Sequence, residues 1–134
     1  MLTAEQVEDF RQSWRPTPEK VDLAVKTAIE IANPSRIFIF GSWARRETTI
    51  DSDLDLAVLI PDERKHEIGE LRNKILRRFS DIPMSIDLVI ASEGYAAEFL
   101  DSINSIYFKI LRNGELVYDD GTHSTSESAS YQSC

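Results

Sequence analysis

Short apolar runs alternate with longer amphipathic ones along the chain, and this pattern predicts both strands and helices. Residues 36–40 are almost wholly β-branched or aromatic, as is typical of a short strand covered on both faces. Residues 53–60 place alternate side chains on opposite faces, so Asp53 and Asp55 share one face. A third strand is expected at 85–91, where a further aspartate lies among apolar residues.

Helical periodicity surrounds these strands. Thr17-Pro18 have the character of an N-cap and first helical residue, and Asn33-Pro34 is expected to end that helix. A shorter helix should begin at a capping box that starts at Thr3. Apolar residues recur every three or four positions in 62–79, and Ser92 is expected to cap an interrupted helical segment after the third strand.

These elements predict one α/β (α+β) domain with a small mixed sheet flanked by helices. The domain is expected to cover 1–118, with an N-terminal helix in 1–16 and the core in 17–118. The loop between the first two strands lacks a convincing crossover helix, so we expect those strands to be antiparallel. The helix between the second and third strands permits a parallel pair. Residues 119–134 are rich in Ser and Thr and are expected to form a disordered tail.

Composition and charge restrict the function. The chain has 134 residues and a net charge of −8, which disfavours general binding to nucleic acid because phosphates would be repelled. We see no apolar run long enough to span a membrane and no secretory signal. The only cysteine is Cys134, so a disulfide framework is excluded within one chain and a cytoplasmic location is expected.

Three aspartates carry the candidate chemistry. Asp53 and Asp55 repel each other unless a cation lies between them, and paired carboxylates suit Mg²⁺ that is bound together with substrate phosphates. Asp87 on a neighbouring strand would complete a site for two ions about 3.5–4 Å apart. One ion would activate the attacking oxygen, and the other would hold a triphosphate and stabilise the leaving group.

A Gly-Ser pair follows the first strand. Gly41 allows a phosphate to approach the backbone, Ser42 offers an N–H and a hydroxyl, and Arg45 and Arg46 are placed to reach phosphate oxygens. Each feature also has an ordinary interpretation, since an Asp-x-Asp pair can be a surface strand end and Gly-Ser only a turn. Asp87, flanked by apolar residues, is expected to be buried and to need a partner, either a basic side chain or a metal.

The combination is more specific than its parts. Gly41-Ser42, ten intervening residues and Asp53-Leu54-Asp55 form the pattern GSx10DxD between two strands. Over residues 17–118 the chain resembles the nucleotidyltransferase superfamily with the DNA-polymerase-β-like fold. It looks most like the minimal nucleotidyltransferases (MNT), the antitoxins of HEPN/MNT toxin–antitoxin pairs. Many members have Gly-Ser-x-Ala-Arg-Gly, whereas this chain has Arg46 in place of the last glycine.

The resemblance implies transfer of a nucleoside monophosphate with release of pyrophosphate, with ATP as the usual donor and Mg²⁺ as the metal. It also implies that the third carboxylate helps to deprotonate the acceptor hydroxyl. The residues that it implicates in metal binding and catalysis are Asp53, Asp55 and Asp87, and in nucleotide binding Gly41, Ser42 and Arg45.

The leading hypothesis is an antitoxin that transfers AMP to a hydroxyl, expected to be a tyrosine, of a HEPN ribonuclease toxin. One alternative is a non-catalytic antitoxin or scaffold that masks its partner through aromatic side chains. Another is an enzyme that modifies a small molecule such as an antibiotic. The acceptor, the preferred base and the homo- or hetero-oligomeric state stay open. The aromatic residues considered for a contact surface are Trp14, Tyr95, Phe99, Tyr107 and Phe108.

Overall fold

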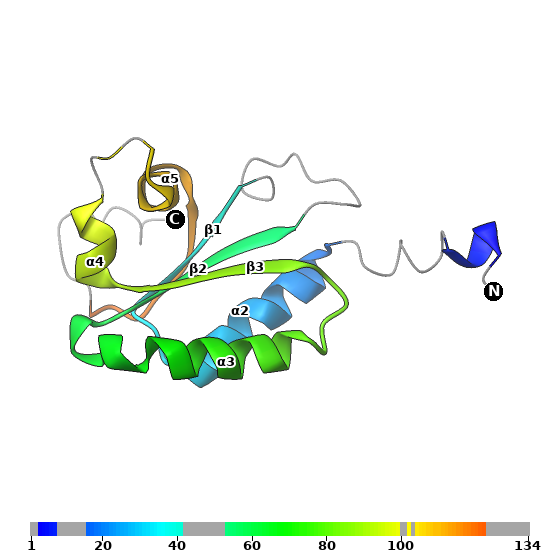
Figure 1. Ribbon diagram of the computed structural model, residues 1–134, viewed down its shortest axis with the longest axis horizontal. Helices are drawn as coiled ribbons and strands as arrows, with labels where there is room; N and C mark the ends of the chain where they lie inside the picture. Colours follow the sequence, from blue (N-terminus) through cyan, green and yellow to red (C-terminus); the bar gives the residue numbers. More distant parts are fainter. Residues whose placement is uncertain (1–2, 8–15, 42–52, 100–101, 103, 123–134) are drawn as a thin grey trace.

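A computed structural model describes residues 3–7, 16–41, 53–99, 102 and 104–122 of the chain. Within these residues the centre of the fold is one four-stranded sheet with the strand order β3-β2-β1-β4 (Figure 1). The predicted α/β fold with a small mixed sheet is confirmed. The strands are β1 (Arg36–Phe40), β2 (Leu54–Ile60), β3 (Ile86–Ser92) and β4 (Glu115–Asp119).

Both predicted strand pairings are confirmed. β1 runs antiparallel to β2, and β2 runs parallel to β3. β1 also pairs antiparallel with β4, and the register shifts so that Ile37 aligns with Tyr118 but Phe38 aligns with Leu116. This shift leaves Val117 without an aligned partner in β1, as in a β-bulge.

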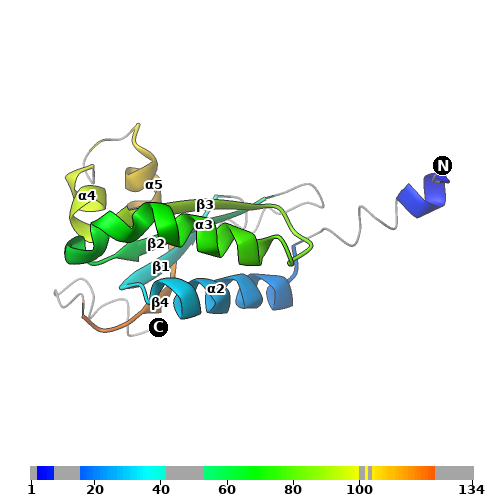
Figure 2. The ribbon, with the colours of Figure 1, turned by 60° about the horizontal axis from the view of Figure 1, so that its bottom comes forward.

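The helices form two layers. Helices α2 (Pro18–Ala32) and α3 (Ile68–Phe79) lie on one face of the sheet, while α4 (Glu93–Glu98) and α5 (Ile106–Asn113) lie on the other (Figures 1 and 2). The segment predicted as one helix over 62–79 begins instead as a 3₁₀ helix, η1 (Asp62–Glu67).

Local side-chain chemistry fixes the ends of α2. The Thr17 hydroxyl accepts a hydrogen bond from the Lys20 N–H at 3.2 Å, and Pro18 occupies the first turn. Asn33 adopts a left-handed conformation with φ 45°, and its N–H donates to the Ile29 carbonyl. The predicted limits of this helix are therefore confirmed.

The N-terminal capping box is also present. The Gln6 N–H donates to the Thr3 hydroxyl at 3.1 Å, and the Thr3 N–H donates to the Gln6 side-chain oxygen at 2.8 Å. The described helical residues here are 4–7, and the rest of the predicted N-terminal helix lies outside the described residues.

The sheet separates two apolar cores, as the alternation along its strands predicts. The larger core packs alternate residues of the strands against α2 and α3. The smaller core packs the intervening residues against α4 and α5, around Phe38, Ala57, Leu59, Ala91, Ala96 and Ile110. β1 is covered on both faces, which explains its nearly continuous apolar sequence.

The described residues continue past position 118, where the predicted domain ends. β4 includes Asp119, and the Asp120 N–H donates to the Ser35 carbonyl at 3.0 Å. Residues 123–134 of the expected tail lie outside the described residues. Among the helices that are described, none has the length and apolar character required to cross a membrane.

Candidate active site

The two aspartates of neighbouring strands lie side by side at one end of the sheet. Asp55 aligns with Phe40 of β1 on one side and with Asp87 of β3 on the other. Directly aligned residues point to the same face of a sheet, so both carboxylates lie on the face that α4 and α5 partly cover. Asp53 precedes β2 by one residue and is exposed.

Gly41 ends β1 against the Asp55 side chain. Its φ is +75°, a conformation that favours glycine because a Cβ would be strained. A Cβ at this position would also collide with the Asp55 carboxylate and lie 3.1 Å from its Cγ. The glycine is therefore needed both for the turn and for the close approach of the turn to Asp55.

A cavity of about 670 Å³ opens beside this turn. Gly41 and Asp55 line it together with three residues of α5. Its volume is within the usual range for small-molecule sites, roughly 300–1,000 Å³. The described residues that line it are Phe40, Gly41, Asp55, Ile106, Lys109 and Asn113.

The structure brings together part of the predicted site. Gly41 and Asp55 share the cavity, and Asp87 adjoins Asp55 through the strand register. Ser42, Arg45 and the atypical Arg46 lie outside the described residues.

The expectation that Asp87 is buried is wrong. Asp87 is exposed, whereas Val89 on the same face is half-buried and packs with the smaller core. β3 is an edge strand, and the covering helices α4 and α5 pack further along its length. No burial cost therefore demands a partner for Asp87, and its carboxylate is accessible to a ligand.

The acidic side chains fit a magnesium ion that arrives with phosphates. Carboxylate oxygens are the hard ligands that Mg²⁺ prefers. Among the residues that the structure describes, no group of three acidic, histidine or cysteine side chains is arranged to hold an ion by itself. Mg²⁺ usually needs only one or two carboxylates, together with waters and substrate phosphates, so the adjacent pair Asp55 and Asp87 meets this requirement.

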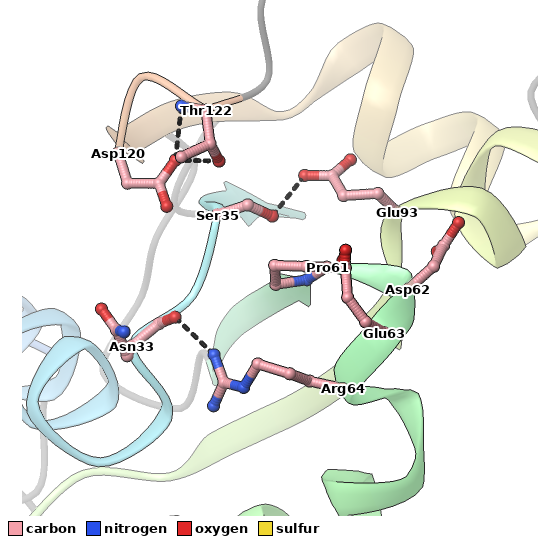
Figure 3. Close-up of a pocket in the computed structure, with 9 residues that line it drawn as sticks. All are labelled: Asn33, Ser35, Pro61, Asp62, Glu63, Arg64, Glu93, Asp120 and Thr122. Carbon is pink, nitrogen blue, oxygen red and sulfur yellow. Dashed lines mark hydrogen bonds between the residues drawn. The ribbon is translucent and has the colours of Figure 1, made fainter.

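A second cavity, of about 530 Å³, lies at the opposite end of the sheet (Figure 3). Arg64 donates to the carbonyls of Ala32 and Asn33 at 2.7 and 2.8 Å, which joins η1 to the end of α2. Ser35 donates to Glu93 at 2.7 Å, which joins the start of β1 to α4. Because the side chains of Arg64 and Ser35 join helices to the chain around β1, we interpret this cavity as part of the packing of the fold and not as a second active site. Its described lining is Asn33, Ser35, Pro61, Asp62, Glu63, Arg64, Glu93, Asp120 and Thr122.

A buried ion pair strengthens the same end of the sheet. Arg36 donates to both carboxylate oxygens of Glu93, at 2.7 and 3.0 Å, and the two side chains are only 8% and 14% exposed. The Arg36 guanidinium also lies 5.2 Å from the centre of the Phe38 ring. Local sequence patterns do not predict this pair, because Arg36 and Glu93 are 57 positions apart.

The aromatic residues of α4 and α5 form a cluster outside the candidate active site. Tyr95, Phe99 and Tyr107 have ring centroids 5.1–5.7 Å apart, and Tyr95 is half exposed. Burial, and then the neighbouring Tyr95, raise the pKa of Tyr107 above its usual value, while Arg72 opposes this shift. Trp14, considered for the same surface, lies outside the described residues.

Sequence reasoning missed the α5 wall of the cavity. Ile106, Lys109 and Asn113 are spaced three and four residues apart, so they share one face of the helix. This spacing was visible in the sequence. Nothing in the sequence alone indicated that this face, rather than another, would turn toward the end of β1.

The chain is similar to known proteins in sequence and in structure. Residues 24–122 match the family described as polymerase beta, nucleotidyltransferase. A crystal structure from Sulfolobus solfataricus, provisionally described as a nucleotidyltransferase, is similar at 18% sequence identity and a TM-score of 0.45. The match covers 80% of this chain and 93% of that chain. A comparison with curated proteins gave no match. The family match covers most of the chain, and the chain therefore belongs to the polymerase beta nucleotidyltransferase family.

Proposed function

We propose that this chain is a Mg²⁺-dependent nucleotidyltransferase that moves AMP from ATP to a hydroxyl of a partner protein. In the full form of the proposal the partner is a HEPN toxin, the acceptor is a tyrosine, and the modification silences the toxin. Membership of the polymerase beta nucleotidyltransferase family supports nucleotidyl transfer in general. The donor, the metal and the protein acceptor are the parts that the proposal adds.

The observation that carries the proposal is the alignment of Asp55 with Asp87 beside the Gly41 turn. Phosphoryl and nucleotidyl transfer depend mainly on positioning and on neutralisation of charge. Asp55 lines a nucleotide-sized cavity and Asp87 is aligned with it in the sheet, so the two carboxylates would provide a place for metal-bound phosphates.

Each residue has a defined role in the proposed reaction. Asp53, Asp55 and Asp87 would hold the metal, and Gly41 lets the triphosphate approach the backbone. The Asp87 carboxylate accepts the proton of the attacking hydroxyl. The hydroxyl oxygen forms a bond to the α-phosphorus, the bond from the α-phosphorus to the bridging oxygen breaks, and pyrophosphate leaves. Mg²⁺, when bound, neutralises the phosphates and lowers the pKa of the acceptor hydroxyl.

A protein acceptor is supported by the accessibility of the site. Asp53 and Asp87 are both exposed, so a hydroxyl on the surface of a folded partner can reach them. The resemblance to the minimal nucleotidyltransferases supplies the specific partner class, a HEPN toxin.

The test uses ATP that carries a radioactive α-phosphate. The purified chain is incubated with Mg²⁺, labelled ATP and the product of the neighbouring gene, and label on each protein is measured after electrophoresis. We expect label on the partner, at a tyrosine identified by mass spectrometry. The double variant Asp53→Asn/Asp55→Asn should abolish labelling, whereas Asp22→Asn, an exposed α2 residue on the opposite face, should not change it.

The alternatives give different results. If the double variant neutralises the partner as well as the wild-type chain and no label is transferred, the protein is a binding antitoxin instead. If label appears on an added aminoglycoside but not on the protein partner, the substrate is a small molecule.

A further inference from the structure

The cavity contains a lysine that none of the sequence motifs includes. Lys109 of α5 lines the cavity together with Gly41 and Asp55. Ile106 and Asn113 share its helix face, and Phe40 adds a second apolar side chain to the lining. This wall therefore combines apolar surface, one amide and one positive charge, which are the kinds of group that a nucleotide needs.

The charge of Lys109 is not used within the described structure. No ion pair joins Lys109 to a carboxylate of the described residues. Lys26 and Lys74, by contrast, each pair with a carboxylate one helical turn away, at 2.9 and 3.0 Å. A cation that faces a cavity in a chain of net charge −8 is available to an anionic ligand.

We infer that Lys109 binds the triphosphate of the donor nucleotide from the α5 wall of the cavity. This inference rests on the proposed function, because it assigns a residue to the donor of that reaction. The Asp55 carboxylate would repel the phosphates, and a metal ion held by the acidic side chains would offset part of that repulsion. Lys109 supplies further positive charge to the cavity, as a compact ammonium with three donors.

The inference predicts a dependence on the number of phosphates. Hydrogen bonds to charged groups are strong enough for the loss of one to weaken binding by about 10- to 100-fold. Lys109→Met should weaken the binding of ATP by this factor and leave the binding of adenosine unchanged. Lys109→Arg, which keeps the charge, should recover most of the affinity for ATP.

The experiment is calorimetric titration of each variant with ATP and with adenosine, in the presence of Mg²⁺ and without an acceptor. Lys74→Met is the matched control, since Lys74 is an exposed helical lysine on α3, on the opposite face of the sheet. Lys109 is itself exposed, so its variants should melt at the wild-type temperature.

Two results would overturn the inference. One is wild-type affinity for ATP in Lys109→Met, and the other is an equal loss of affinity for ATP and adenosine, which would mean that Lys109 supports the cavity and not the phosphates. If the wild-type chain still transfers label and Asp53→Asn/Asp55→Asn does not, either result refutes this inference and spares the proposed function. Failure of the wild-type chain to bind ATP would refute both.

Discussion

Replacement of Gly41 by alanine tests the candidate active site most directly. The added methyl group introduces two separate strains. The residue would keep a φ near +75°, which L-residues rarely adopt, and its Cβ would collide with the Asp55 carboxylate. The Asp55 Cβ is 3.5 Å from the added atom, an ordinary contact, so rotation of the carboxylate can relieve the collision without moving the strand.

The two strains differ in size and in consequence. A left-handed alanine costs about 1–2 kcal/mol. An Asp55 side chain turned away from its preferred rotamer adds about 0.5–1.5 kcal/mol. We therefore expect Gly41→Ala to lower the free energy of unfolding by roughly 2–3 kcal/mol. Activity should fall much further, by about 100-fold or more, because a displacement of a catalytic group by about 1 Å can have that effect.

Gly121 provides a matched control. Its φ is +86°, but no atom lies within 4 Å of a Cβ built on it. Gly121→Ala should therefore show the backbone strain alone, with a loss of about 1–2 kcal/mol and no loss of transfer. Chemical denaturation followed by circular dichroism measures the stability of both variants, and the α-phosphate labelling assay measures transfer.

The comparison of the two alanine variants can refute the reasoning. If Gly41→Ala transfers AMP at the wild-type rate, the position of Asp55 beside the turn does not matter for catalysis. If both variants lose stability and activity equally, the contact with Asp55 contributes nothing beyond the backbone strain.

Three further substitutions separate chemistry from stability. Asp87→Asn should reduce transfer by about 100-fold or more. Because the side chain is exposed, the free energy of unfolding should change by less than about 0.5 kcal/mol. A large drop in melting temperature would contradict the proposed role. Glu93→Gln leaves Arg36 buried without its carboxylate and should cost about 3–5 kcal/mol in urea denaturation, whereas a loss near zero would mean that the pair is replaceable. Burial raises the pKa of Tyr107, so the folded chain favours the neutral phenol more than the unfolded chain does. The contribution of this neutral phenol to stability is complete below pH 10.0 and is lost as the pH rises through the higher folded-state pKa. Tyr107→Phe should flatten this alkaline decline in melting temperature, and an unchanged decline would assign it to other groups.

Much of the fold follows from local patterns in the sequence. The alternation in β2 separates the residues of the two cores. The sequence after β1 has no convincing pattern of a crossover helix, so the antiparallel pairing of β1 with β2 could be predicted. The caps of α2 depend on Thr17 and Asn33 acting on backbone groups within a few residues, so they could be predicted. Each of these features depends on residues that are close together in the chain.

The features that could not be predicted depend on residues far apart in the chain. The Arg36–Glu93 pair joins side chains 57 positions apart, and neither neighbourhood indicates the other. The exposure of Asp87 follows from the position of β3 at the sheet edge, and its apolar neighbours suggested burial instead. Lys109 reaches the cavity only because α5 packs over β1.

The two ends of the sheet have different physical requirements, and this difference makes the site testable by substitution. At the end where β2 and β3 finish, Arg36 and Glu93 are buried and hydrogen-bonded, so a change there removes a partner from a buried charge. At the other end Asp53 and Asp87 are exposed, so a change there removes no buried contact. Conservative substitutions of those exposed aspartates should therefore alter transfer without unfolding the chain, and loss of activity in them can be attributed to the chemistry of the site.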